Sequence, residues 1–122
     1  MLECGVDLIE IERIEKAVAR LGDRFVNRVF TEQERAYARG RGPQLAARFA
    51  AKEAAAKILG TGVWRHGVNW HDIEVVNDPS GKPHLHLHGE AANRAAELGL
   101  TNWSVSLSHS RGDAIALVVA TG

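Results

Sequence analysis

The chain has 122 residues, 45% of them hydrophobic and 25% charged, a composition typical of a folded domain and not of a disordered chain. Lysine and arginine balance aspartate and glutamate at 15 each, so no overall charge attracts nucleic acid or an anionic membrane. The one cysteine, Cys4, excludes an internal disulfide and is expected to pack as a small buried residue. No apolar stretch is long enough to span a bilayer, and the acidic N-terminus is unlike a signal peptide. We therefore expect a single domain (1–122) in the cytoplasm.

The first half of the sequence predicts a strand followed by three helices. Residues 2–9 are rich in aliphatic residues, and residues 10–21 then place apolar side chains at helical spacing until Gly22, which ends the helix. The segment "TEQE" (31–34) is a capping box that starts a helix over 32–39. Pro43 suits the first turn of a third helix, which continues to Leu59.

The second half predicts two hairpins separated by a helix. Residues 70–77 and 84–88 have strand patterns and flank the turn "DPSGKP". An alanine-rich helix over 89–98 follows, and strands over 103–108 and 114–120 complete the chain. This order predicts an α+β fold in which helices pack on a mostly antiparallel sheet.

The third predicted helix carries charges inside an alanine-rich segment, "RFAAKEAAAKILGTG" (48–62). At 100° per residue Leu45, Phe49, Ala56 and Leu59 form one apolar stripe, with Glu53 and Lys57 along its edge. Glu53 and Lys57 have the spacing of an ordinary helix salt bridge. The alanines, however, permit close approach of backbone or ligand, and a sheltered carboxylate needs a cation.

Two further features of this region have both a structural and a functional interpretation. Gly60, Thr61 and Gly62 form either a simple helix C-cap or a loop that follows a phosphate or a pantetheine-like chain. Asp7 is either a cap for the helix that begins near Glu10 or, together with Glu53, a pair of carboxylates suited to Mg²⁺.

The histidines are interpreted from their positions in predicted strands. His109 ends a strand in "SLSHS" and is either a turn residue or a catalytic group. In "HLHLH" the leucines are expected to be buried and His84, His86 and His88 to face outward, so we do not predict a zinc site there.

Basic residues recur every three or four positions between Arg13 and Arg28. They would line one side of a helix if that helix continued past Gly22. This pattern is either a solvated surface or a docking strip for an acidic protein, formed by Arg13, Lys16, Arg20, Arg24 and Arg28.

Four motifs in order, "GVDLIEIERIEKA", "RFVNRVFTEQE", "ARFAAKEAAAKILGTG" and "VSLSHS", resemble the holo-[acyl carrier protein] synthase family, the small bacterial type of 4′-phosphopantetheinyl transferase. The resemblance covers nearly the whole chain. It implies transfer of the 4′-phosphopantetheine group of coenzyme A to a serine of apo acyl carrier protein in fatty acid biosynthesis, with release of adenosine 3′,5′-bisphosphate and a requirement for Mg²⁺. It also implies a homotrimer with active sites between subunits.

The resemblance also implies roles for particular residues. Asp7 and Glu53 would hold the metal, and Lys57 would neutralise the pyrophosphate. Either Glu53, a metal-bound water or His109 would take the serine proton. Contacts to coenzyme A are implied for Arg48, Lys82, Pro83, His109 and Ser110, together with the Gly60-Thr61-Gly62 loop, and Arg39 and Arg41 are candidates for its 3′-phosphate. The acidic carrier would dock on Arg13, Arg20, Arg24 and Arg28. Neither Lys52 nor Trp64 receives a role.

Two other functions fit the same residues. A Mg²⁺-dependent hydrolase of nucleotides or phosphodiesters would use the same Asp7 and Glu53 pair. An oligomeric adaptor without enzymatic activity would need only the arginines that bind an acidic partner.

Overall fold

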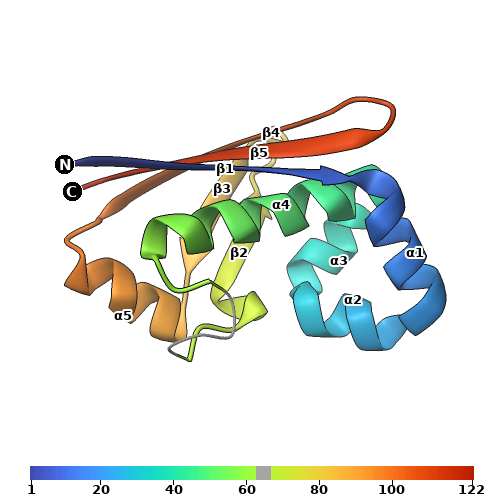
Figure 1. Cartoon of the computed structure of the whole chain (residues 1–122), viewed down its shortest axis with the longest axis horizontal. Coiled ribbons are helices and arrows are strands. Elements are labelled where there is room, and N and C mark those ends of the chain that lie inside the picture. Colours follow the sequence, from blue (N-terminus) through green and yellow to red (C-terminus); the bar gives the residue numbers. More distant parts are fainter. Residues whose placement is uncertain (63–66) are drawn as a thin grey trace.

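The computed structural model (Figure 1) describes residues 1–62 and 67–122, so Trp64 lies outside the described residues. Strand β1 (Leu2–Glu10) leads into helices α1 (Ile11–Leu21), α2 (Asp23–Val29), α3 (Glu32–Ala38) and the long α4 (Gly42–Leu59). The short 3-10 helix η1 (Trp70–Asp72) precedes a hairpin of β2 (Ile73–Asn77) and β3 (Pro83–Leu87). Helix α5 (Gly89–Glu97) then connects to a second hairpin, β4 (Asn102–His109) and β5 (Asp113–Thr121).

The strands form two antiparallel sheets, which confirms the predicted α+β class. One sheet has the order β1-β5-β4, and β2 pairs with β3 in the other. Leu2 pairs with Thr121, so the two termini lie side by side at one end of the larger sheet (Figure 1). The first strand is thereby fixed to the last.

Helix α4 lies under the larger sheet, with α1, α2 and α3 at one end and α5 at the other (Figure 1). The predicted apolar stripe is buried, with Leu45, Ala56 and Leu59 inaccessible and Phe49 half-buried, but the burial of α4 extends around most of its circumference. Its buried residues include seven alanines together with Leu45, Leu59, Arg48 and Lys52. A central helix of small residues lets several elements contact it at once, and two of its long polar side chains are therefore buried as well.

The contact between α4 and β1 is unusually close. A Cβ atom built on Gly5 would collide with the carbonyl oxygen of Ala54. The facing side chains of β5 are also small, since Ala114, Ala116 and Ala120 are fully buried. Small residues on both surfaces therefore set how near Asp7, two residues beyond Gly5, lies to α4.

The opposite face of the larger sheet is exposed and apolar. Val6 and Leu8 of β1 are exposed, as are Ile115 and Leu117 of β5, and the strand register places these four side by side. Cys4 lies on the same face and is exposed, so the expectation that it is buried is wrong. The even-numbered residues of β1 point away from α4, which explains the difference.

Three local details also differ from the sequence predictions. Helix α2 was not predicted. Gly22, at φ 59° and ψ −135°, separates it from α1, so the basic residues from Arg13 to Arg28 do not follow one continuous helix. The segment that begins at Trp70 is first a 3-10 turn and becomes a strand at Ile73.

Within the described residues no helix is both long and apolar enough to cross a membrane.

Candidate active site

Asp7, Glu53 and Lys57 form a charged cluster where β1 packs on α4. Lys57 Nζ donates to Asp7 Oδ1 at 3.0 Å and to the carbonyl oxygen of Val6 at 2.8 Å. Asp7 is therefore not a helix cap: it lies inside β1, and the N-cap of α1 is Glu10, which makes no side-chain capping bond. The ion pair of Lys57 is with Asp7 on a different element, and not the local pair with Glu53 that its spacing allowed.

The electrostatics of this cluster favour a bound cation. Partial burial of Glu53 raises the pKa of its carboxyl, the negative charge of Asp7 raises that pKa further, and Lys57 opposes both effects. A carboxyl group with a raised pKa beside a second carboxylate is stabilised by added positive charge.

The donor set of the cluster fits Mg²⁺. This ion usually takes one or two protein carboxylates and fills its other positions with water and substrate phosphates. Within residues 1–62 and 67–122 there is no group of three or more histidine, cysteine, aspartate or glutamate side chains placed to hold a metal, whereas structural zinc sites normally have four protein ligands. Asp7 and Glu53 are the two carboxylates that such a magnesium site could use.

A cavity of about 350 Å³ lies beside the N-terminal half of α4 and is called here the α4 cavity. Four residues predicted to contact coenzyme A line it: Arg48, Lys82, Pro83 and His109. Tyr37, Gln44 and Asn77 also line it and were not predicted. The remaining lining residues are Ala47, Gly81, Val105, Ser106, Leu107 and Ser108.

Arg48 is held rigidly in the wall of the α4 cavity. Its guanidinium donates to Gln44 Oε1 at 2.9 Å and to Asn77 Oδ1 at 2.6 Å, and it lies 4.6 Å from the centre of the Tyr37 ring. The side chain is 1% exposed, and this burial lowers the pKa of the guanidinium. Its Nε is buried without a hydrogen-bond partner in the described part of the chain.

Arg48 forms no salt bridge with any carboxylate among the described residues. Its acceptors are the neutral oxygens of Gln44 and Asn77. A buried cation is normally paired with an anion, so the α4 cavity provides a place where a ligand anion would be stabilised. One sequence signal was available for this arrangement, because Gln44 precedes Arg48 by one helical turn.

A rigid turn places Lys82 and Pro83 at the cavity. Asp78 Oδ1 accepts from the backbone N–H of Ser80 at 2.9 Å and of Lys82 at 3.0 Å, and Asp78 Oδ2 lies 3.0 Å from His84 Nε2. Hydrogen bonds from Ser80 and His84 hold the pKa of the Asp78 carboxyl well below its usual range. As predicted, His84, His86 and His88 are exposed and Leu85 is buried, whereas Leu87 is only half-buried.

Other predicted contact residues lie elsewhere. Gly60 adopts φ 72° and its N–H bonds back to Ala56 and Lys57, which is the C-cap geometry. Neither this loop nor Ser110 is part of the described lining of the α4 cavity. Ser110 belongs to the β4–β5 turn, where its N–H donates to the carbonyl oxygen of Asp113 at 2.9 Å.

The predicted docking arginines divide into two exposed pairs. Arg13 and Arg20 are on α1, seven residues apart and so on one face of that helix, and Arg24 and Arg28 are one turn apart on α2. Arg41 donates to the carbonyl oxygens of Ala38 and Tyr37. Arg39 is the α3 C-cap, in the left-handed region.

The charged cluster and the α4 cavity are on different faces of α4. Glu53 follows Arg48 by five residues, which is roughly 140° around the helix axis at 100° per residue. Arg48 contacts β2 and α3, whereas Lys57 contacts β1. Within the described lining, the cavity includes none of Asp7, Glu53 and Lys57.

Comparison with known proteins identifies the class of this fold and site. The 4′-phosphopantetheinyl transferase superfamily profile matches residues 3–118, so the chain belongs to this superfamily, as the motifs predicted. A holo-[acyl-carrier-protein] synthase of Herpetosiphon aurantiacus is 58% identical over 127 residues, with 100% of both chains covered.

Solved structures agree with this assignment. The crystal structure of the Helicobacter pylori holo-[acyl-carrier-protein] synthase in complex with coenzyme A superposes with a TM-score of 0.88 and 31% identity, over 98% of this chain and 100% of that one. The Bacillus anthracis synthase in complex with CoA (3′,5′-ADP) has a TM-score of 0.75 and 40% identity, over 96% of this chain and 93% of that one.

Proposed function

We propose that the protein transfers the 4′-phosphopantetheine group of coenzyme A to a serine of apo acyl carrier protein in fatty acid biosynthesis. The observation that carries this proposal is Arg48, a buried cation without a carboxylate partner in the described chain, in the wall of a cavity that also contains Lys82 and His109. Coenzyme A brings phosphate groups that match the positive charges of Arg48 and Lys82. Its presence in the related Helicobacter pylori structure supports the choice of ligand.

In this reaction the serine hydroxyl oxygen attacks the phosphorus of the phosphopantetheine group. The bond from that phosphorus to the bridging oxygen breaks, and adenosine 3′,5′-bisphosphate leaves with the bonding electron pair. The serine proton passes to a base. Such transfers depend mainly on positioning and on stabilising the charge that develops on phosphate oxygens.

Asp7 and Glu53 would hold Mg²⁺, which when bound supplies positive charge to the pyrophosphate. Lys57 contributes a second positive charge. Its side chain is 55% exposed although it is paired with Asp7, so the flexible lysine stem allows the ammonium to turn toward a phosphate. Glu53, whose carboxyl pKa is raised by burial and by Asp7, and His109 at the cavity are the protein groups available to take the serine proton.

A homotrimer with shared active sites accounts for two features of the single chain. The exposed residues Val6, Leu8, Ile115 and Leu117 form one contiguous apolar face. Such a contiguous patch, unlike singly scattered apolar residues, is typical of an interface. The charged cluster and the α4 cavity are on different faces of α4, so a neighbouring subunit would place its own cavity beside the cluster. The related structures belong to the same class of enzyme.

Arg13 and Arg20 on α1, and Arg24 and Arg28 on α2, would bind the acidic carrier. All four are exposed. Opposite charge on the two proteins would steer their encounter, and increasing salt would weaken it.

Intact-mass spectrometry of the carrier tests the proposal. Apo acyl carrier protein is incubated with coenzyme A and the protein, with Mg²⁺ or with EDTA. We expect an addition of about 340 Da, the mass of the arm bound through a phosphodiester, in the Mg²⁺ sample only. An unmodified carrier would refute the proposal, and release of adenosine 3′,5′-bisphosphate without a modified carrier would indicate a hydrolase.

A further inference from the structure

A fully buried ion pair joins α4 to α3, and its lysine follows Arg48 of the cavity wall by four residues. Lys52 Nζ lies 2.8 Å from Glu34 Oε1, and both side chains are 0% exposed. Lys52 also donates to the carbonyl oxygens of Trp70 at 2.9 Å and Ile73 at 2.6 Å. The three N–H groups of the ammonium therefore have three acceptors, which is its full capacity.

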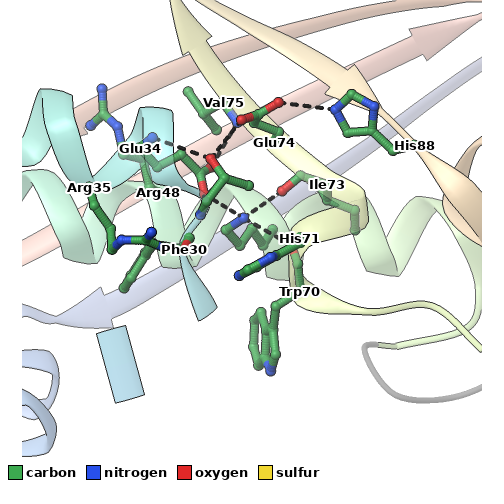
Figure 2. Close-up of polar contacts among 12 residues, drawn as sticks. Phe30, Glu34, Arg35, Arg48, Trp70, His71, Ile73, Glu74, Val75 and His88 are labelled. Atoms are coloured by element: carbon green, nitrogen blue, oxygen red, sulfur yellow. Dashed lines mark hydrogen bonds and ion pairs between the residues drawn. The ribbon is translucent and has the colours of Figure 1, made fainter. Parts of the chain in front are cut away.

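Glu34 extends this connection to β2 (Figure 2). Its Oε2 accepts from the backbone N–H of Val75 at 2.8 Å, and its Oε1 accepts from the backbone N–H of Thr31 at 2.8 Å. Helix α3, helix α4 and strand β2 are thus joined through one carboxylate and one ammonium. A further arm runs from Thr31 through Glu74 to the exposed His88.

The stability of the folded state does not by itself explain why this ion pair is buried. Burial lowers the pKa of the Lys52 ammonium, and the carboxylates of Glu34 and Glu74 oppose that effect. Replacing a buried ion pair with well-packed hydrophobic residues of similar volume is often neutral or stabilising, because the cost of desolvating both charges can equal or exceed their attraction. What the pair supplies is a defined arrangement of the three elements, since each bond has a direction and a fixed length.

Each of the three elements joined by the ion pair also contributes a residue to the wall of the α4 cavity. Arg48 lies four residues before Lys52 on α4, Tyr37 lies three residues after Glu34 on α3, and Asn77 lies two residues after Val75 on β2. These intervals keep each side chain on the same face as its buried counterpart. Arg48 in turn contacts both Asn77 Oδ1, at 2.6 Å, and the Tyr37 ring, at 4.6 Å.

We propose that Lys52 and Glu34 are positioning residues for coenzyme A: their buried ion pair sets the places of α3, α4 and β2 so that Arg48 is presented to the α4 cavity. This inference rests on the proposed function, because it assumes that coenzyme A binds in this cavity. Neither residue touches the ligand. Loss of the pair should therefore weaken coenzyme A binding and leave the transfer step itself intact.

The test uses the double variant Lys52→Met/Glu34→Gln, which removes both buried charges and preserves side-chain size. Coenzyme A binding is measured by isothermal titration calorimetry, and the KM for coenzyme A and kcat are measured by carrier modification at saturating Mg²⁺. We expect the Kd and the KM to rise about tenfold, the effect of losing one well-placed charged hydrogen bond, with kcat within about twofold of wild type. The matched control is Ile14→Ala, which removes a buried side chain of α1 that does not line the α4 cavity, and should lower the melting temperature without changing either constant.

The outcomes separate the two proposals. A wild-type protein that does not bind coenzyme A would refute the proposed function. A folded double variant with the wild-type Kd and KM would refute the positioning role. A fall in kcat at unchanged KM would also refute it, because a purely structural defect lowers only the fraction of active protein. If circular dichroism shows the double variant to be unfolded, Glu34→Gln alone, which keeps an oxygen for Val75, is measured in the same way, and an unchanged Kd again refutes the role.

Discussion

Gly5→Ala tests whether the close packing of β1 on α4 sets the geometry of the charged cluster. The added methyl group would collide with the carbonyl oxygen of Ala54. That oxygen belongs to the backbone of α4 and cannot rotate away, so the strand and the helix must separate. Because Asp7 is two residues from Gly5 and Glu53 is adjacent to Ala54, the same separation should move the two carboxylates apart.

The magnitude follows from the packing. Overpacking a close contact costs about 3 kcal/mol at its upper end, and replacing glycine within a strand recovers up to about 1 kcal/mol of backbone entropy. The net loss is about 2 kcal/mol. With an unfolding entropy of about 0.26 kcal/mol/K for 122 residues, Tm should fall by about 8 °C.

The assay is thermal unfolding followed by circular dichroism, at one protein concentration because oligomers melt in a concentration-dependent way. The Mg²⁺ concentration that gives half-maximal transfer is measured alongside and should increase. Gly112→Ala is the control, since a Cβ at Gly112 meets no atom within 4 Å. A Gly5→Ala protein with the Tm and Mg²⁺ requirement of the control would refute this reasoning.

Three other substitutions test separate parts of the site. Glu53→Gln in EDTA should raise Tm by an amount that grows as the pH rises above about 4.3 and levels off once the pH passes the raised pKa of the folded carboxyl. The reason is that ionised Glu53 destabilises the folded state, and a pH-independent difference would contradict this. Lys57→Met should lower kcat about 100-fold with little change in the KM for coenzyme A, the pattern of lost transition-state stabilisation, and a rise in KM alone would place Lys57 in ground-state binding. Leu8→Lys adds a charge to the exposed apolar face and should reduce the proposed trimer to monomers in light scattering; an unchanged mass would exclude this face as the interface.

Local sequence signals predicted much of the fold. The capping box at Thr31 is present, with both reciprocal bonds formed, and the two hairpins occupy the expected segments. Helix α2 was missed because its seven residues are too short to show a periodic apolar pattern. A few residues of regular spacing do not distinguish a helix from a loop.

The burial of α4 could not be predicted from its own sequence. Alanine carries little information about which face is buried, so the sequence assigned no role to Lys52. It is paired with Glu34, 18 positions earlier in the chain. Contacts between distant segments are not encoded in local periodicity. For the same reason the sequence did not predict that Tyr37 and Asn77 lie in the cavity wall.

The charged cluster was easier to predict than the cavity. Asp7 and Glu53 carry charge at points where a strand and an alanine-rich helix invite close packing, and Lys57 lies one turn beyond Glu53. Arg48 was identified only through the family resemblance. The spacing of Gln44 and Arg48, one helical turn, allowed their bond, but no sequence pattern indicated the bond to Asn77, 29 positions away.

Subunit complementation tests the central claim most directly: that the cluster of one subunit acts with the α4 cavity of its neighbour. Arg48→Met and Glu53→Gln proteins, each with low activity alone, are mixed, dissociated and reassembled, and carrier modification is measured. In a ring of identical head-to-tail interfaces, random mixing gives about one quarter of the sites an intact Arg48 and an intact Glu53, so activity should recover to about one quarter of wild type. If each subunit instead holds a complete site, the mixture will remain as inactive as its parents.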